Sequence, residues 1–373
     1  MLPVPFDYQP RTRIVHGPGS LARLGELVKE YGGTRALVVS DPGIVAAGHT
    51  TRAVSFLVQA KVQARVFGDV HENPTTEDVA RCVEIAKEFG TDFIIGLGGG
   101  SSMDTAKGAN FILTNGGKMK DYWGVGKAKK PMLPSICVPT TSGTGSECQS
   151  FALISDAKTH AKMACGDSKA AAKVALLDPE LTVSQPQRVT ACTGIDALAH
   201  AVETAVTTKR TPISGLFARE AFRLCEQSLE IVLSKPKQLE ARARMQLGAA
   251  FAGLAIENSM LGAAHSCANP LTARYGIVHG EAVGLMLPHV VRFNAKRAPV
   301  AAIYREMYPQ GDLAKRLSTL LRAAGMPQQL RHYGITKADL SDLADQAAQQ
   351  WTAQFNPRPV KAKDFRALYK EAL

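Results

Sequence analysis

Long apolar runs are missing from this sequence. No stretch reaches the ~18 apolar residues of a membrane-spanning helix, and the N-terminal stretch has Asp7 and prolines where a secretory signal would need unbroken apolar residues. Paired cysteines are missing too, because the seven cysteines show no CxxC spacing and an odd number cannot all pair within one chain. We therefore expect a soluble cytoplasmic protein with reduced thiols.

Low-complexity tracts and clustered charges are also scarce. Hydrophobic residues make up 45% of the chain and charged residues 21%, close to the averages of globular proteins, which excludes a disordered chain. The positive excess of 44 − 33 = 11 charges is dispersed, apart from Lys127, Lys129 and Lys130. No aromatic ladder interleaves with these lysines, as a nucleic-acid groove would require. The excess therefore indicates a basic surface or an anionic small-molecule ligand.

The first half of the chain alternates short apolar runs with amphipathic stretches. The predicted strands lie at residues 36–40, 62–67, 93–97 and 135–139. The predicted helices lie at residues 21–31 and 77–89. Thr75 and Thr76 are N-cap candidates for the second helix, which should end at Gly90. Strands that alternate with helices predict a parallel sheet with ligands at its carboxyl edge.

The second half changes character near Pro186. Beyond it β-rich runs become rare, and Ala- and Leu-rich stretches of helical length follow, separated by Pro or Gly. The predicted helices lie at residues 191–207, 213–233, 242–260 and 281–297. Because 373 residues exceed one typical small domain, we expect two domains: an α/β domain at 1–186 and an all-helical domain at 187–373.

Two loops that follow predicted strands are suited to phosphate or ribose. The first, GLGGGS at 96–101, precedes a helical stretch, so its backbone and the helix N-terminus can approach a pyrophosphate. The second, PTTSGTGSE at 139–147, has five threonine and serine hydroxyls beside two glycines. A plain tight turn and a Ser/Thr turn are the alternatives. Ser101 replaces the last glycine of GxGxxG, and neither loop continues into GK[ST], which excludes a Walker loop.

Asp41 directly follows the first predicted strand. A carboxylate there can accept hydrogen bonds from an adenosine ribose and would repel a 2′-phosphate, which favours NAD over NADP. In the ordinary Rossmann order this acid follows the glycine loop, whereas here it precedes the loop, so a different topology is expected. The alternative is a simple Asp-Pro-Gly turn.

Aspartate and histidine in the second half form a pattern typical of a metal site. Asp196 and His200 are four residues apart in a predicted helix, so both side chains can point at one place. His265 and His279 are separated by a proline and a glycine and should lie on successive elements. A lone histidine is usually a packed residue. Three with an aspartate favour a ligand set suited to Fe²⁺ or Zn²⁺ rather than Ca²⁺ or Mg²⁺.

With these residues in place, the chain resembles the iron-containing (group III) alcohol dehydrogenases from about Phe6 to its end. The matching motifs are GGGSSMDTAK (98–107), PTTSGTGSE (139–147), LLDPELT (176–182), GIDALAHAVE (194–203) and HGEAVGLMLPHV (279–290). The resemblance implies an α/β NAD(P)-binding domain and an all-helical, metal-binding catalytic domain, an architecture shared with dehydroquinate synthase. It also implies a cleft for cofactor and metal, and a homodimer or higher homo-oligomer.

The resemblance also implies roles for individual residues. The positions that match the pyrophosphate loop and then the second nucleotide loop are Gly98, Gly99, Gly100, Ser101 and Asp104, followed by Thr140, Thr141 and Thr144. Asp41 corresponds to the ribose-binding acid, and Lys162 to a lysine near the nicotinamide ribose that we also count as catalytic. All four metal ligands align: Asp196, His200, His265 and His279.

Asn269 departs from the family pattern and is our other catalytic candidate. The family commonly has a second histidine in HGxxHxL, often credited with proton relay, whereas this chain has HSCANPL at 265–271. An amide forms hydrogen bonds but cannot exchange a proton near neutral pH. Either water and the cofactor ribose carry the proton, or the substrate differs from simple alkanols and is polar or anionic.

The expected function is that of a metal-dependent NAD(P) alcohol dehydrogenase or aldehyde reductase (EC 1.1.1.-). Hydride would pass between the nicotinamide C4 and a metal-bound alcohol or aldehyde. NAD and Fe²⁺ are expected, with NADP and Zn²⁺ as alternatives, and no nucleic-acid or membrane partner. The rival functions are a dehydroquinate synthase-like lyase that uses NAD transiently and a metal- and nucleotide-binding protein without turnover.

Overall fold

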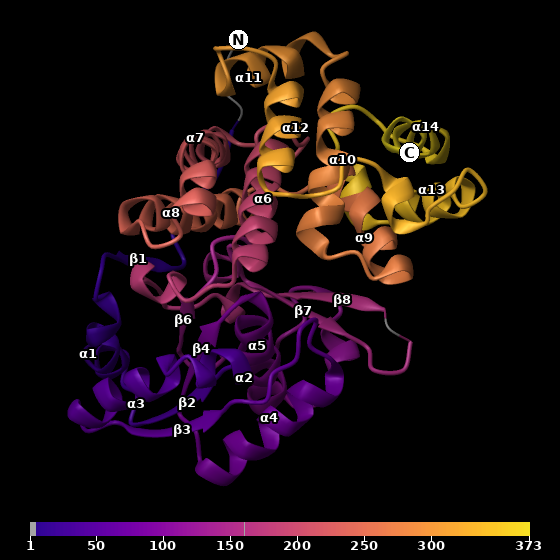
Figure 1. Ribbon diagram of the computed structural model, residues 1–373. Helices are drawn as coiled ribbons and strands as arrows, with labels where there is room; N and C mark the ends of the chain where they lie inside the picture. Colours follow the sequence, from indigo (N-terminus) through magenta and orange to yellow (C-terminus); the bar gives the residue numbers. More distant parts are fainter. Residues whose placement is uncertain (1–4, 160) are drawn as a thin grey trace. The chain divides into compact units, whose positions relative to one another are not determined.

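The computed structural model describes residues 5–159 and 161–373, which divide into an α/β unit and a helical unit (Figure 1). The α/β unit comprises Gln9–Thr141 and Gly145–Gln185. The helical unit comprises residues 5–8, Ser142–Thr144 and Pro186–Leu373. The helical unit takes over at Pro186, where β-rich runs become rare in the sequence. Residues 5–8 and Ser142–Thr144 of the first half also belong to the helical unit.

The α/β unit is built on a six-stranded sheet in which every neighbouring pair is parallel, in the order β1-β9-β6-β4-β2-β3. Its strands are β1 (Arg13–His16), β2 (Arg35–Val39), β3 (Gln63–Phe67), β4 (Phe93–Gly98), β6 (Ser135–Pro139) and β9 (Val174–Leu177). The parallel sheet and its strands β2, β3, β4 and β6 confirm the prediction from the apolar runs. β1 and β9 were not predicted, because four residues each are too few for a clear pattern.

Helices cover both faces of this sheet. They are α1 (Leu24–Glu30), α2 (Pro42–Ala46), α3 (His49–Gln59), α4 (Thr76–Phe89) and α5 (Gly100–Asn115), with 3₁₀ turns η1 (Ser20–Arg23), η2 (Met119–Tyr122), η3 (Ser146–Cys148), η4 (Ser168–Ala170) and η5 (Pro179–Thr182). Successive strand residues point to opposite faces. Leu37 and Val39 share a core with α4 and α5, whereas Ala36 and Val38 share a core with α1 and α3. Burial on both faces explains the continuous apolar runs of the strands.

Local sequence explains where α4 begins and ends. The Thr75 hydroxyl accepts a hydrogen bond from the N–H of Asp78, and the Asp78 carboxylate accepts one from the N–H of Thr75, which forms a capping box. Gly90 closes the helix at φ 64°. The predicted caps of this helix are therefore confirmed, with Thr75 as the N-cap.

A second, three-stranded sheet lies in the same unit and was not predicted. It has the order β5-β8-β7, with β5 (Gly124–Val125), β7 (Phe151–Ser155) and β8 (Lys162–Gly166), and the β7–β8 pair is antiparallel. In β7 the buried Ala152 and Ile154 alternate with the partly exposed Leu153. An alternation over five residues is a weak signal in sequence.

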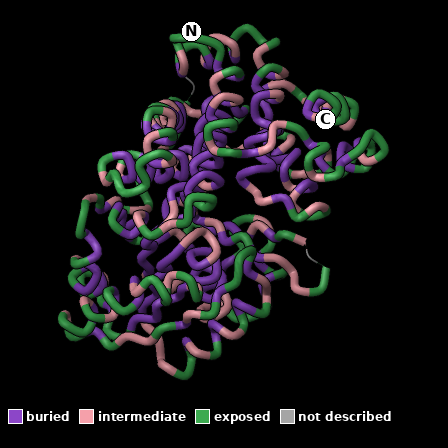
Figure 2. Tube along the Cα trace, in the orientation of Figure 1, coloured by how far each residue is buried: buried purple, intermediate pink, exposed green. Residues whose placement is uncertain are grey.

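The described part of the helical unit contains no β-strand. Its helices are α6 (Gln187–Thr204), α7 (Pro212–Ser234), α8 (Leu239–Glu257), α9 (Ala263–Tyr275), α10 (His279–Asn294), α11 (Ala298–Met307), α12 (Leu313–Ala323), α13 (Leu340–Ala348) and α14 (Ala362–Ala372), with 3₁₀ turns η6 (Leu330–Tyr333) and η7 (Trp351–Phe355). Figure 2 shows α6 and α10 buried along most of their length. The all-helical fold was predicted, but α9 and the helices after α10 were not predicted individually. Pro270 interrupts the pattern of α9.

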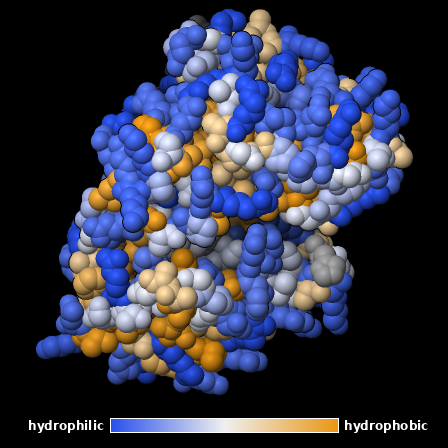
Figure 3. Space-filling view, viewed as in Figure 1, coloured by the Kyte–Doolittle hydropathy of each residue, from blue (hydrophilic) through white to orange (hydrophobic). Residues whose placement is uncertain are grey.

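Three features bear on the expectations from composition: helix hydropathy, the surface and the cysteines. Within the described residues, no helix is both long and apolar enough to cross a membrane. The face seen in Figure 3 is largely hydrophilic, with apolar side chains in separate patches. All seven cysteines lie in the described part of the chain, where they are buried and form no disulfide.

Candidate functional site

The predicted nucleotide-binding segments meet at the carboxyl edge of the six-stranded sheet. β4 and β6 are neighbours, with Gly98 opposite Pro139, and the N–H of Thr140 donates to the Gly98 carbonyl at 2.9 Å. β2, which leads into Asp41, pairs with the other side of β4. The glycine loop thus lies between Asp41 and the second loop, in a strand order that differs from the Rossmann arrangement, as predicted.

The glycine loop has the backbone that a close approach to a ligand needs. Gly98 adopts φ 152°, and a Cβ there would lie 3.0 Å from the Asp41 carboxylate. Gly99 is the N-cap of α5 and has no side chain to accept from the first N–H groups of this 16-residue helix. An uncapped helix N-terminus beside glycines is suited to a phosphate.

Asp41 forms the turn that was considered for it and also contacts α5. It is the N-cap of α2, because its Oδ1 accepts from the N–H of Ile44 at 3.1 Å. Its Oδ2 accepts from the Ser102 hydroxyl at 3.1 Å, which holds the carboxylate beside the first turn of α5. The residue is therefore a turn former whose carboxylate also lies beside the start of α5.

Asp104 is engaged inside the α/β unit. Its carboxylate accepts from the Ser146 hydroxyl at 2.7 Å. The Lys107 Nζ donates to the Ser146 carbonyl at 2.5 Å and to its hydroxyl at 2.8 Å. Burial raises the pKa of Asp104, although Lys107 and Ser146 oppose the shift. These contacts tie α5 to the end of the second loop. The Asp104 carboxylate therefore holds that loop from inside the α/β unit.

The remaining predicted nucleotide residues divide between the two units. Thr140 is buried, and its hydroxyl forms no hydrogen bond with the described residues. A Cβ on Gly99 would touch the Thr141 methyl at 3.4 Å, so these two residues face each other. Thr144 belongs to the helical unit. Lys162 is the exposed first residue of β8, and its charge acts on Asp104.

The helical unit brings the four predicted metal ligands together. Asp196 and His200 lie one turn apart on α6, His265 lies in the first turn of α9, and His279 begins α10. Oδ1 of Asp196 is 3.5 Å from Nε2 of His200, 3.6 Å from Nε2 of His265 and 4.0 Å from Nε2 of His279. A tetrahedral ion with bonds of about 2.1 Å separates its ligand atoms by about 3.4 Å. The ligand atoms of Asp196, His265 and His279 all lie within 4.8 Å of one another, which is close to the spacing of one ion's ligand shell. His200 is not part of this mutual group, although its Nε2 lies beside Asp196.

Hydrogen bonds at Nδ1 orient the imidazole rings of His200 and His265. Nδ1 of His200 lies 3.2 Å from the Gly143 carbonyl, and Nδ1 of His265 lies 2.5 Å from Oε2 of Glu203. Because a carbonyl and a carboxylate only accept, each Nδ1 donates, which leaves Nε2 as the nitrogen that is directed at the other ligands. Nε2 of His265 and Oδ1 of Asp196 are buried without a hydrogen bond to the described residues. Buried polar atoms of this kind are costly unless they meet a cation.

The charges at this centre favour a positive ion. Burial opposes ionisation of Asp196, but His200, His265 and His279 together lower its pKa. Burial lowers the pKa of His200. Burial also opposes a charge on His265, yet Asp196 and Glu203 raise the pKa of this imidazole to about 9. Two buried carboxylates thus make the centre attractive to a cation, and the donor set fits a divalent transition metal.

Two residues of this centre escaped the sequence analysis. Glu203 lies in GIDALAHAVE, three residues beyond His200, and that helical spacing is the signal that could have identified it. Gly143 belongs to the second loop, which was assigned to the nucleotide alone. A Cβ on Gly143 would lie 2.5 Å from the Thr193 side chain, so only glycine lets this loop bring its carbonyl to His200.

Asn269 lies on α9 one turn beyond His265 and is half-buried. Its Nδ2 donates to Oε1 of Gln350 at 2.9 Å. Residues four apart share one helix face, so the amide lies on the same side of α9 as the metal ligand. At this position the family commonly has its second histidine.

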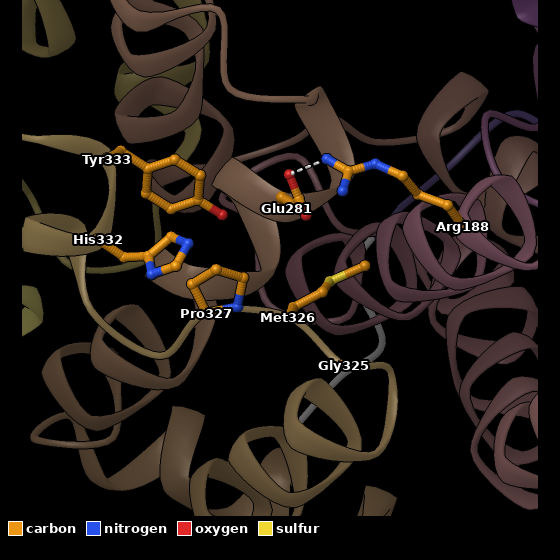
Figure 4. A pocket seen from close by; sticks show the side chains of 7 residues that line it. All are labelled: Arg188, Glu281, Gly325, Met326, Pro327, His332 and Tyr333. Carbon is orange, nitrogen blue, oxygen red and sulfur yellow. Dashed lines mark hydrogen bonds and ion pairs between the residues drawn. The ribbon is translucent and has the colours of Figure 1, made fainter.

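A pocket of about 390 Å³ lies in the helical unit (Figure 4). It is lined by Arg188, Glu281, Gly325, Met326, Pro327, His332 and Tyr333. Arg188 forms an ion pair with Glu281 at 3.0 Å. Glu281 is two residues after His279 on α10 and so points to a different face of that helix. Among the described residues, none of the predicted site residues lines this pocket.

Comparison with known proteins identifies the family. Residues 10–179 match the model described as "Iron-containing alcohol dehydrogenase", and residues 190–373 match "Fe-containing alcohol dehydrogenase family, C-terminal". These two matches mark the chain as an oxidoreductase of the alcohol dehydrogenase class. The chain belongs to the iron-containing alcohol dehydrogenase family, which confirms the resemblance and the fold predicted from its motifs.

Individual relatives are similar over nearly their whole length. The chain is 32% identical over 374 residues to the NAD-dependent methanol dehydrogenase of Bacillus methanolicus, covering 96% of this chain and 97% of that protein. It is 32% identical over 371 residues to the sulfoacetaldehyde reductase of Bilophila wadsworthia, covering 95% and 96%. The solved structure of the sulfoacetaldehyde reductase from Bifidobacterium kashiwanohense in complex with NAD+ matches with a TM-score of 0.91 and 29% identity over 99% of both chains.

Proposed function

We propose that this protein is an NAD-dependent alcohol dehydrogenase or aldehyde reductase that requires one divalent metal ion, Fe²⁺ with Zn²⁺ as the alternative. The observation that carries the proposal is the convergence of Asp196 Oδ1 with the Nε2 atoms of His200, His265 and His279 at 3.5–4.0 Å. The names of the relatives, one an NAD-dependent alcohol oxidiser and one an aldehyde reductase, support the same reaction in its two directions.

The four ligands would contribute differently to the binding of the ion. When bound, the metal supplies a Lewis acid that lowers the pKa of an alcohol, and NAD supplies the hydride acceptor. Asp196 contributes the negative charge, and the Gly143 carbonyl orients His200 from behind. The His200 and His265 side chains are 7% and 5% exposed, whereas His279 is 29% exposed. The shell is thus closed toward α6 and α9, and we propose that substrate approaches beside His279.

The cofactor would be held by the carboxyl edge of the parallel sheet. We assign the pyrophosphate to the glycine loop at the start of α5, and the adenosine ribose to Asp41. The buried Thr140 hydroxyl would gain a hydrogen-bond partner from the nucleotide. The carboxylate of Asp41 favours NAD, because a 2′-phosphate would meet a like charge. Lys162 is proposed near the nicotinamide ribose.

The substrate is proposed to be polar or anionic. Asn269 lies on the ligand side of α9 and presents an amide that forms hydrogen bonds but does not take up a proton. A substrate with a hydroxyl, carboxylate or sulfonate would give this amide a partner, and two relatives carry the name sulfoacetaldehyde reductase. The proton would then leave through water and the cofactor ribose.

The test is an NADH assay on metal-free protein and on protein reloaded with Fe²⁺ or Zn²⁺. The aldehydes should include plain alkanals and analogues with carboxylate, phosphonate or sulfonate groups. We expect NADH to be consumed in equal amount to the aldehyde, and only by the metal-loaded protein. Equal activity without metal would overturn the proposal. Substrate conversion without net NADH change would indicate the lyase, and no turnover at all would indicate a binding protein.

A cytoplasmic location and a homo-oligomeric state are further proposals. Seven buried thiols without a disulfide suit a reducing compartment. The oligomer is proposed from the family resemblance. Light scattering coupled to size-exclusion chromatography tests it, since a mass near 39.9 kDa would mean a monomer.

A further inference from the structure

We propose that Glu203 is a positioning residue of the metal centre that holds His265 as an Nδ1–H imidazole with its Nε2 directed at the ion. The inference rests on the proposed function, because His265 acts as a ligand only if this centre binds metal. Glu203 would act through His265, from the outer side of the ligand shell.

Both carboxylate oxygens of Glu203 are committed to α9. Oε2 lies 2.5 Å from Nδ1 of His265, and Oε1 accepts from the N–H of Ala264 at 2.7 Å. Glu203 is 4% exposed and lies on α6 seven residues after Asp196, on the same helix face. One helix therefore supplies two ligands and the group that orients a third.

The chain before α9 is shaped so that this carboxylate can reach it. A Cβ on Gly262, the N-cap of α9, would lie 3.0 Å from Oε1 of Glu203 and 3.1 Å from Oδ1 of Asn356. Asn356 Oδ1 lies 3.3 Å from the N–H of Ala263. The N-terminus of α9 thus has two buried acceptors, and only one of them also contacts a metal ligand.

The two carboxylate oxygens of Glu203 both accept hydrogen bonds, which predicts what the isosteric change Glu203→Gln would do. A glutamine at position 203 has one oxygen and one NH₂ group. If its oxygen accepts from Ala264, the NH₂ faces Nδ1 of His265 and favours the tautomer with the proton on Nε2, which removes the lone pair that binds metal. If the oxygen faces His265, the NH₂ opposes the N–H of Ala264. No orientation of the amide replaces both hydrogen bonds.

The negative charge of Glu203 adds to the orientation. A carboxylate behind a histidine raises the basicity of the nitrogen that faces the metal. His200 has only a neutral backbone carbonyl in the equivalent place. His265 should therefore be the stronger of the two imidazole donors, and its strength should depend on Glu203.

The test compares Glu203→Gln with Asn356→Ala, which removes the other acceptor at the same helix end without touching His265. Zn²⁺ affinity is measured by competition with a chromophoric chelator, and the visible spectrum of the Co²⁺-loaded protein reports the ligand field. We expect Glu203→Gln to weaken Zn²⁺ binding by about 10–100-fold and to change the Co²⁺ spectrum. Asn356→Ala should lower thermal stability and leave both metal readouts unchanged.

Several outcomes would overturn the proposal. Wild-type affinity in Glu203→Gln would do so, and so would equal losses in the two variants, which would make Glu203 only a helix cap. If Glu203→Gln does not fold, the Zn²⁺-loaded wild type still decides, because it must show a downfield Nδ1–H proton resonance that disappears in His265→Ala. Unchanged Zn²⁺ affinity in His265→Ala would instead refute the metal site of the proposed function.

Discussion

Glu147, the last residue of the second nucleotide loop, should make the stability of the α/β unit depend on pH. The residue is 2% exposed. Burial raises its pKa from 4.5 to about 7, although a backbone hydrogen bond and the charge of Lys107 oppose the shift. The folded state therefore holds this proton more tightly than the unfolded chain does.

The sign and size of the effect follow from that difference. Between pH 4.5 and about 7 the unfolded chain loses the proton first, so the free energy of unfolding falls as the pH rises. The contribution is fully present below pH 4.5 and lost above about 7. A shift of 7 − 4.5 = 2.5 pH units corresponds to about 3 kcal/mol. Glu147→Gln keeps the shape of the side chain but does not titrate, so this loss should be missing in the variant.

The two tryptophans allow the α/β unit to be followed by itself. Trp123 lies in the α/β unit and Trp351 in the helical unit, so Trp351→Phe leaves a fluorophore that reports only the α/β unit. Urea unfolding of that background, with and without Glu147→Gln, is measured from pH 4.5 to 8 without cofactor. As the pH rises, the free energy of unfolding of the protein with Glu147 should fall by about 3 kcal/mol relative to that of the Glu147→Gln variant.

The control is Glu84→Gln, which changes an exposed carboxylate on α4. It should leave the pH profile parallel to that of the background protein. Parallel profiles for Glu147→Gln as well would refute the reasoning, because they would mean that burial does not hold a proton on Glu147.

The remaining predictions concern the metal, the cofactor and the substrate. His279→Ala should lose bound metal and activity together, since three ligands rarely hold an ion as tightly; full activity in metal-free variant protein would contradict the mechanism. Asp41→Gly should narrow or invert the preference for NAD, measured as kcat/KM with NAD and NADP, and equal efficiencies in the wild type would leave Asp41 as a turn residue. Asn269→His should lower activity on a polar substrate by removing the amide held by Gln350. The same change would raise turnover of simple alcohols, by up to about 10²–10⁴-fold, if proton relay is limiting, and no change in either activity would place Asn269 outside the chemistry.

Local sequence was sufficient where the signal is local. The buried strands read as apolar runs because both faces of a parallel sheet are covered, and α4 shows its caps in Thr75 and Gly90. The pair Asp196 and His200 could be recognised because four residues bring two side chains to one helix face. The short strands β1 and β9 and the helix with Pro270 were beyond such reasoning, since their stability comes from neighbours distant in the chain.

Only the tertiary structure decided which groups surround the predicted residues. Asp104 was assigned to the pyrophosphate loop by motif, and only folding shows that its carboxylate lies against Ser146 and beside Lys107. Gly143 and Glu203 turned out to hold the outer nitrogens of His200 and His265. Their partners are 57 and 62 residues away in sequence. A spacing rule along one helix cannot register such contacts, because they depend on how separate elements pack, and packing sets both the protonation and the direction of a metal ligand.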